Sequence, residues 1–157
     1  MLGIAGDFSQ PGALRSAAER IVAQSPDAFC LHGVAAGDAY AIATRFDCEW
    51  AYRGAQALFW RGTFHIHEVH DRYLPAPPMR PFERRGFLEV NGEFAGLPVS
   101  LIATQLSPDR FRIREMRFVR TAVRAASSAV VLFVAGFDAN SQTYGFDDLA
   151  PARLVIA

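Results

Sequence analysis

The stretch Arg84–Asn140 constrains the fold more than any other part of the chain, because its pattern predicts strands alternating with a helix. Apolar runs predict strands over Phe87–Val90 and Val99–Leu106, with Asn91-Gly92 as the turn between them. A basic helix follows, and the fully apolar run Val130–Ala135 is typical of a strand covered on both faces. Such a strand requires further layers on both sides of its sheet, so the stretch predicts a layered α/β protein.

The helix within this stretch is predicted to start at Ser107-Pro108-Asp109 and to end near Ala126. The three starting residues supply a capping hydroxyl, a proline for the first turn and an acid near the positive end of the helix dipole. Apolar residues recur at helical spacing, and we expect them to face the core: Ile113, Met116, Val119 and Val123.

The same helix carries six arginines, which are Arg110, Arg112, Arg114, Arg117, Arg120 and Arg124. One interpretation is a phosphate-binding or nucleic-acid surface, with Arg114 and Arg117 as phosphate ligands. The other is a solvated face, on which arginine stems cover apolar surface and Glu115 pairs locally. The neutral charge of the whole chain favours the solvated face, and we do not expect nucleic acid as a partner.

Shorter elements precede and follow this stretch. Periodicity and breakers predict strands over Leu2–Ala5, Ala28–Leu31, Trp50–Tyr52, Ala55–Trp60, Phe64–Val69 and Arg153–Ala157, and helices over Pro11–Gln24 and, capped by Asp38, Ala39–Phe46. Four prolines between residues 75 and 81 predict a loop. Its flanking pieces are too short to fold alone, so we expect residues 1–157 to form one sheet-rich α/β (α+β) domain.

Composition limits the function classes. The chain has 157 residues, with sixteen arginines, no lysine and sixteen acidic residues, so chemistry that needs a lysine is excluded. Cys30 and Cys48 form no metal or redox motif, and free thiols in a reducing compartment are expected. No apolar run reaches membrane-spanning length and no leader pattern opens the chain, so a cytoplasmic location and no membrane partner are expected.

Several motifs occur in a characteristic order. A Pro-Asp pair precedes an apolar strand ending Leu31-His32-Gly33-Val34, a later strand ends Thr104-Gln105-Leu106, and the run after residue 129 ends Gly136-Phe137-Asp138-Ala139-Asn140. In this order they resemble the endonuclease/exonuclease/phosphatase superfamily, the metal-dependent hydrolases of phosphate esters. The matching segments are residues 18–34, 41–61, 85–106, 110–126 and 130–140. The resemblance implies a β-sandwich with flanking helices, a truncated form of the four-layer α/β/β/α type.

The resemblance also implies where a catalytic site would lie. Asp7 falls near a metal-binding Asn of the family, and Gly33 takes the place of its metal-binding Glu. Gln105 replaces a phosphate-binding His, and an Asp-x-Asn pair survives as Asp138 and Asn140, displaced by one residue. The implied catalytic residues are therefore Asp138, Asn140 and Gln105, with Asp7 and Asp138 as ligands of Mg²⁺ or another divalent metal.

These departures decide between two functions. Gln56 stands where the family has the Asn of Gly-Asn-Ala, and no histidine follows His70 to match the family's final Ser-Asp-His. Loss of the metal-binding Glu, the phosphate-binding His and the general-base His removes three contributions to phosphoryl transfer. The preferred hypothesis is a degenerate, non-catalytic domain that binds a partner or self-associates as a homodimer. The alternative is a metal-dependent phosphoesterase or nuclease with a rearranged site.

Three of the four histidines cluster in His65-Ile66-His67-Glu68-Val69-His70-Asp71. On a regular strand His65, His67 and Asp71 would share one face, where they offer an alternative site for zinc or another divalent metal. The competing interpretation is a half-buried strand with polar residues on one side. Nearby aromatic residues are expected to pack in the core: Trp50, Tyr52, Phe59 and Trp60.

A second resemblance remains open. The opening Met-Leu-Gly-Ile-Ala-Gly is similar to the Met-Cys-Gly-Ile-Ala-Gly of class II glutamine amidotransferase domains, and Asn91-Gly92-Glu93 is similar to their Asn-Gly-Glu motif. Leu2 occupies the position of the nucleophilic cysteine, so the resemblance would imply such a domain without its nucleophile.

Overall fold

The structure is a computed structural model that describes residues 3–7, 13–76, 85–107, 110–135 and 153–156. Its first sheet has four strands in the order β1-β2-β4-β3. Their bounds are β1 Gly3–Asp7, β2 Ala28–His32, β3 Glu49–Arg53 and β4 Gln56–Trp60. β1 and β2 are parallel, whereas β4 runs antiparallel to both β2 and β3.

The second sheet has five strands in the order β5-β6-β7-β8-β9. Their bounds are β5 Phe64–Tyr73, β6 Gly86–Phe94, β7 Leu97–Gln105, β8 Ala129–Ala135 and β9 Arg153–Ile156. β5, β6 and β7 form an antiparallel meander, and β8 and β9 continue the sheet in parallel with β7. The β7–α3–β8 connection supplies the crossover that a parallel pair requires.

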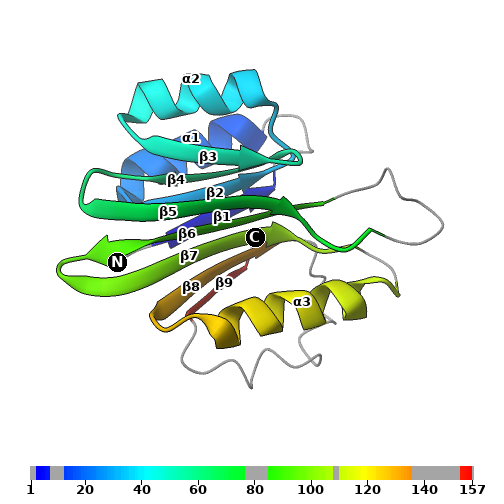
Figure 1. Ribbon diagram of the computed structural model, residues 1–157. Helices are drawn as coiled ribbons and strands as arrows, with labels where there is room; N and C mark the ends of the chain where they lie inside the picture. The colour runs from blue at the N-terminus through cyan, green and yellow to red at the C-terminus, as the bar shows by residue number, and fades with distance from the viewer. Residues whose placement is uncertain (1–2, 8–12, 77–84, 108–109, 136–152, 157) are drawn as a thin grey trace.

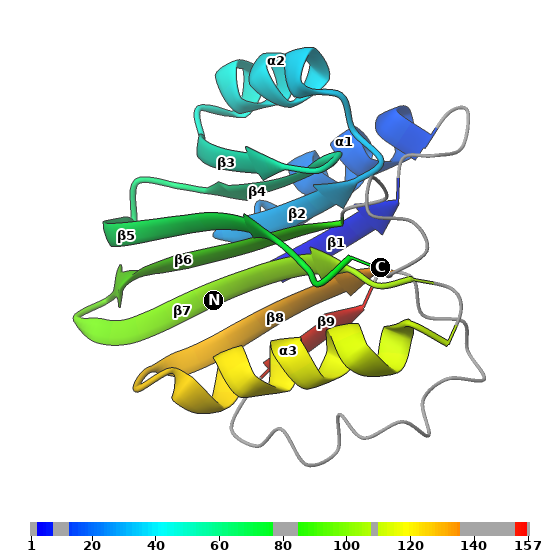
Figure 2. The ribbon, with the colours of Figure 1, turned by 45° about the vertical axis from the view of Figure 1, so that its right-hand side comes forward.

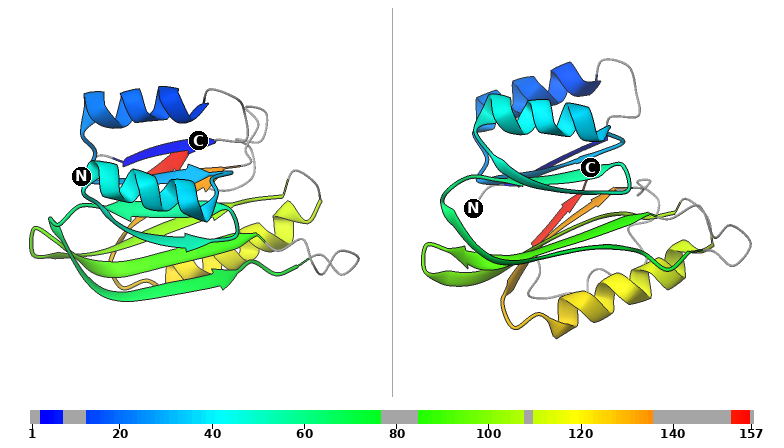
Figure 3. Two further views of the ribbon diagram at one scale, coloured as in Figure 1. Left: turned by 90° about the horizontal axis from the view of Figure 1, so that it is seen from above. Right: turned by 45° about the horizontal axis from the view of Figure 1, so that its top comes forward.

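The two sheets face each other, and helices cover their outer faces (Figures 1 and 3). α1 (Ala13–Gln24) and α2 (Ala36–Phe46) lie over the first sheet, and α3 (Arg112–Ala125) lies over the second. Three apolar clusters separate these layers: one between the sheets, one under α3, and one under α1 and α2. The observed architecture is the expected four-layer α/β/β/α sandwich.

The strand β8 shows why the sequence favours these layers. Val131 and Phe133 lie in the cluster between the sheets, whereas Val130, Leu132 and Val134 pack under α3. Alternate residues of a strand point to opposite faces, so an uninterrupted apolar run is stable only where both faces are covered. The prediction for Val130–Ala135 is confirmed. The predicted core position of Phe59 and Trp60, both buried, is also confirmed.

The predicted turn at Asn91-Gly92 is wrong. β6 continues through both residues, which pair with Ser100 and Val99 of β7, and the hairpin turns instead at Ala95-Gly96. Ala95 and Gly96 have φ values of 52° and 76°, which suit a tight hairpin turn. The local Asn-Gly signal is overridden because the longer hairpin adds further cross-strand pairs.

Both predicted helix caps are also wrong. α2 begins at Ala36 after Ala35, which leaves Asp38 in the first turn rather than at the cap. α3 begins at Arg112, and neither helix has a side-chain cap hydrogen bond. Pro108 and Asp109 lie outside the described residues. In the described part of the chain, no helix is both long enough and apolar enough to cross a membrane.

Candidate functional site

Polar residues from both sheets gather at one end of the sandwich. The arrowheads of β1, β2, β7 and β8 point to this end, and β4 starts there (Figure 2). The polar end is defined here as His32, Arg53, Gln56, Gly86 and Gln105. Register pairs His32 with Gln56 and Gln56 with Arg53 in the first sheet. The ends of β6 and β7 contribute Gly86 and Gln105 from the second.

Gln56 links the two sheets at this end. It is fully buried, and its Nε2 donates a hydrogen bond to the Ala103 carbonyl oxygen of β7 at 3.0 Å. Its Oε1 is buried without a hydrogen-bond partner in the described structure. The side chain therefore acts as a tie between sheets, and it is not aimed outward as a ligand would be.

Gly86 shows how closely the sheets approach one another. A Cβ added at Gly86 would lie 2.1 Å from the Arg53 carbonyl oxygen and 2.9 Å from the Gln56 Nε2. No side chain can occupy that space unless backbone moves, so glycine is required at this contact. The close contact leaves little room between the sheets beside Gln56.

His32 and Cys30 form a buried pair with the residue types of a nucleophile and its base. The Cys30 Sγ lies 3.4 Å from the His32 Nε2, and both residues are fully buried. Burial raises the pKa of the Cys30 thiol well above its ordinary value, because the thiolate would lose its hydration. Cys30 is therefore a protonated core thiol, and the predicted free state of both cysteines is confirmed.

Gly33 occupies the position at which the family resemblance implies a metal-binding glutamate. It lies directly after β2, is exposed, and has φ of 73°. That backbone conformation is readily adopted by glycine but is unfavourable for a residue with a Cβ. The backbone as well as the side chain thus departs from what a glutamate ligand would need.

The other implied ligands are placed only in part. Asp7 ends β1 beside His32, and nothing of its side chain is described. Asp138 and Asn140 lie outside the described residues. A hard cation such as Mg²⁺ prefers carboxylate oxygens, and the described side chains of the polar end are His32, Arg53, Gln56 and Gln105. These four do not fit a magnesium site.

The β7–α3 connection beside Gln105 is held by a buried carboxylate. Both oxygens of Glu115 accept hydrogen bonds from Ser107, one from its backbone N–H at 2.6 Å and one from its hydroxyl at 2.7 Å. Arg112 donates to the Ser107 carbonyl oxygen, and Arg85 donates to the Ser107 hydroxyl. These contacts take the place of the expected local pairing of Glu115, and they fix Ser107, two residues after Gln105.

A cluster of Arg53, Asp71 and Tyr73 at the polar end was not predicted from the sequence. Arg53 ends β3 and forms an ion pair with Asp71 of β5, and its guanidinium lies over the Tyr73 ring at 5.1 Å. A hydrogen bond with Tyr73, together with the charge of Asp71, raises the pKa of Arg53. These residues come from different sheets, so only the packing of β3 against β5 could bring them together.

The predicted metal face of β5 is wrong. A β-bulge between Ile66 and Glu68 shifts the register, so that His65 pairs with Glu93 while Asp71 pairs with Leu88. Glu93 and Leu88 are an odd number of residues apart on β6, so His65 and Asp71 face opposite sides of the sheet. In the described part of the chain, no three His, Cys, Asp or Glu side chains are grouped to hold a metal ion.

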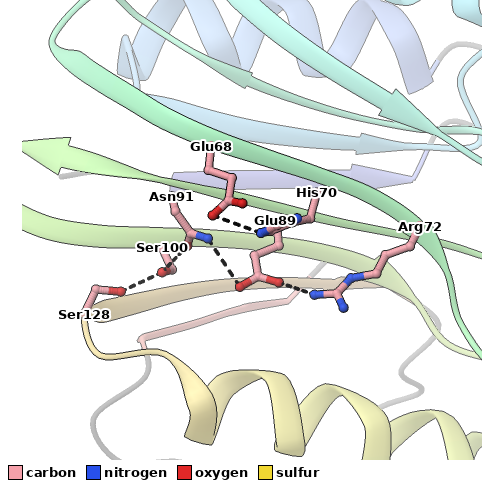
Figure 4. A network of polar contacts seen from close by, with 7 residues as sticks. All are labelled: Glu68, His70, Arg72, Glu89, Asn91, Ser100 and Ser128. Carbon is pink, nitrogen blue, oxygen red and sulfur yellow. Dashed lines mark hydrogen bonds and ion pairs between the residues drawn. The ribbon is translucent and has the colours of Figure 1, made fainter.

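The outer face of β5 and β6 instead carries a polar network (Figure 4). Arg72 donates to Glu89 at 2.5 Å, Asn91 bridges Glu89 and Ser100, and the Ser100 and Ser128 hydroxyls lie 2.6 Å apart. His70 contacts Glu68 at 3.1 Å in the same view.

The two phosphate ligands predicted on α3 are surface residues, in contrast to the buried His32 and Gln56 of the polar end. Arg114 and Arg117 are exposed on the helix surface, while Met116, Val119 and Val123 of the same helix are buried. Ile113, which was predicted to face the core, is 55% exposed. Within the described residues, no carboxylate pairs with Arg114 or Arg117.

The sheet order and the flanking helices define a fold class, the four-layer α/β/β/α sandwich. The chain has the endonuclease/exonuclease/phosphatase fold, with similarity to solved members of that family. No protein-family model and no curated protein matches the chain.

Three solved structures illustrate the similarity. An endonuclease/exonuclease/phosphatase family protein from Bacteroides thetaiotaomicron has 14% identity and a TM-score of 0.69, over 90% of this chain and 63% of its own. The mannosyl-6-phosphatase of the same organism has 12% identity and a TM-score of 0.68, over 90% and 66%. TDP2 from Caenorhabditis elegans has 20% identity and a TM-score of 0.59, over 71% and 36%. The chain thus spans about one third to two thirds of the structures it resembles.

Proposed function

We propose that this chain is a non-catalytic domain of the endonuclease/exonuclease/phosphatase fold that acts by binding a partner protein. The fold is that of phosphoesterases, as the names of its structural relatives indicate. The polar end lies where the family resemblance implies a phosphoesterase site, and its described side chains, His32, Arg53, Gln56 and Gln105, include no carboxylate. The class II glutamine amidotransferase hypothesis is not favoured, because the structural relatives belong to the other fold.

The observation that carries this proposal is Gly33. Phosphodiester hydrolysis requires a cation on the phosphoryl oxygens and an activated water, and carboxylates hold that cation. Gly33 offers no side-chain ligand atom, and its φ of 73° disfavours replacement by a glutamate. Gln105 adds to the loss, because an uncharged amide stabilises a developing phosphoryl charge less than a protonated histidine does.

Metal titration with a generic phosphodiester tests the proposal. The purified chain would be incubated with bis(4-nitrophenyl) phosphate and increasing Mg²⁺ or Mn²⁺, beside the variant Asp138→Ala. For both proteins, we expect the rate of nitrophenol release to equal the rate in a control that contains substrate and metal without protein. Metal-dependent turnover by the parent that disappears in Asp138→Ala would overturn the proposal. That result would support the alternative function, a metal-dependent phosphoesterase that uses Asp138, and Asp7, Asn140 and Gln105 would be the next residues to vary.

A further inference from the structure

The outer face of the second sheet is covered unevenly. α3 packs over β7, β8 and the end of β6 near Phe87, through the apolar cluster that contains Met116, Val119 and Val123. The rest of β6 and all of β5 lie beside the helix, with the polar network on their outer face (Figure 4). This face therefore forms a step, with a raised helix next to a part of the sheet that no described helix covers.

Opposite charges lie on the two sides of this step. The arginine stripe, defined as Arg114, Arg117 and Arg124, is exposed on α3. The glutamate patch, defined as Glu68, Glu89 and Glu93, lies on β5 and β6. Among the described residues Arg72 is paired with Glu89 of this patch, so three carboxylates and one guanidinium give a formal charge of −2 when histidines are counted as neutral, as in the net charge of the chain. The net charge of the whole chain is zero, so these charges are segregated rather than in excess.

The helix that carries the arginine stripe and the strands that carry the glutamate patch are in direct contact. The Arg72 guanidinium lies over the Phe87 ring of β6 at 5.3 Å and over the Phe118 ring of α3 at 5.8 Å. The rings of Phe87 and Phe118 are themselves in edge contact, with centroids 5.2 Å apart. The glutamate patch thus begins where α3 ends its contact with the sheet.

The glutamate patch is ordered before any partner binds. Glu89 is only 12% exposed and is fixed between Arg72 and Asn91. Glu68 and Glu93, 59% and 48% exposed, each contact a histidine of β5. Side chains that are already held lose less conformational entropy on binding, so the patch is suited to a specific electrostatic contact.

The free edge of β5 is an unsuitable place for strand-to-strand association. It carries the β-bulge after Ile66 and the charged residues Glu68, Asp71 and Arg72, features that protect edge strands against pairing. Association through the faces rather than the edges of this sheet is therefore favoured.

We propose that two copies of this chain associate about a twofold axis, with α3 of each copy seated on the β5–β6 face of the other. In a twofold interface each surface meets its counterpart twice, so a step that is basic on one side and acidic on the other is complementary to itself. The inference rests on the proposed binding function and names its partner as a second copy of the chain. Arg114 and Arg117, considered above as phosphate ligands, would then contact Glu68 and Glu93 of the second copy.

A polyanion such as nucleic acid is the competing occupant of the arginine stripe. The adjacent glutamate patch would repel a polyanion that extends beyond the helix, whereas it attracts a second arginine stripe. Three arginines would also neutralise few phosphates, and nucleic-acid affinity grows with the number neutralised. A second copy can therefore contact both the arginine stripe and the glutamate patch, whereas a polyanion can contact only the stripe.

Charge reversal tests the proposal by sedimentation velocity. Arg117→Glu makes the stripe less basic, and Glu93→Arg makes the patch less acidic. Both side chains are exposed, so neither change should affect folding. Arg45→Glu on α2 and Glu19→Arg on α1 are matched controls, because both are exposed on the opposite, first-sheet side of the molecule. Each protein would be measured over a concentration series at low and at high ionic strength.

We expect the parent and both controls to dimerise, less strongly at high ionic strength. Each single reversal should weaken dimerisation at least about tenfold, because like charges then face each other twice. An equimolar mixture of Arg117→Glu with Glu93→Arg should restore the dimer, since both contacts then join opposite charges. A variant with both changes should dimerise with itself for the same reason.

Several results would overturn the inference. A parent that remains monomeric at every concentration would do so, as would reversal variants that dimerise like the parent. Failure of the mixture to dimerise would show that the stripe and the patch do not meet. A fluorescent single-stranded oligonucleotide added to the same samples tests the competing occupant. Binding that is lost in Arg117→Glu, while the parent stays monomeric, would assign the stripe to a polyanion.

The hydrolysis assay separates this inference from the proposed function. Metal-dependent turnover by a dimeric parent would overturn the non-catalytic function and leave the twofold interface intact. A monomeric parent without turnover would overturn the interface alone.

Discussion

The Cys30 thiol is enclosed by the core between the two sheets, and Cys48 lies near the surface after α2. Burial raises the pKa of Cys30, and it also raises that of Cys48, where the charge of Arg61 acts in the opposite direction. Accessibility and ionisation therefore both favour reaction at Cys48.

We predict that one thiol per chain reacts with a disulfide reagent in the native protein and that both react in denaturant. Cys48→Ser is the control. It should abolish the native reaction, because Cys30 keeps its proton and the surrounding core shields it from the reagent. Rapid native labelling of Cys48→Ser would contradict the enclosed position of Cys30. The folded state keeps the Cys30 proton while the unfolded thiol ionises near pH 9, so the stability due to Cys30 is present below that pH and lost as pH rises above it.

At the scale of elements, α3 shows how far helical periodicity can be trusted. The apolar repeat identified the helix and three of its four core residues, Met116, Val119 and Val123. It placed Ile113 wrongly, since Ile113 lies in the first turn on the exposed side. The start of the helix was also missed, because Ser107 is used by Glu115 and does not cap the helix.

Paired substitutions on α3 test this assignment. Met116→Ala should lower the free energy of unfolding by about 2–5 kcal/mol, because it leaves a cavity between the helix and the sheet. Ile113→Ala should change it by less than about 0.5 kcal/mol, because the side chain is mainly exposed. Urea unfolding followed by circular dichroism measures both. Equal effects at the two positions would show that α3 packs through a different face.

At the scale of the whole molecule, the contact between the sheets at Gly86 determines the shape of the polar end. Gly86→Ala should lower the free energy of unfolding by about 1–3 kcal/mol or more, because its Cβ would overlap the Arg53 backbone, which cannot rotate away. Gly62→Ala is the matched control, with no heavy atom within 4 Å of its added Cβ, and should change stability by less than about 0.5 kcal/mol. Thermal unfolding of the two variants measures the difference. A stable Gly86→Ala variant would mean that the sheets lie farther apart.

The sequence by itself determined the layers of this protein. Runs such as Val130–Ala135 can be stable only inside a sandwich, and the order of motifs identified the fold, because hydrophobic burial acts on patterns that are local in the chain. It also predicted the chemical losses at Gly33 and Gln105, since those follow from the residue types at the positions that the resemblance implies.

The tertiary structure alone decided which side chains meet. The β-bulge after Ile66 moved Asp71 away from His65, and the packing of β3 against β5 gave it Arg53 as a partner. The hairpin of β6 and β7 turned at Ala95 rather than at Asn91, and α3 came to lie beside the glutamate patch. Register, bulges and sheet-to-sheet contacts depend on residues far apart in sequence, and a one-residue shift reverses the side a residue faces.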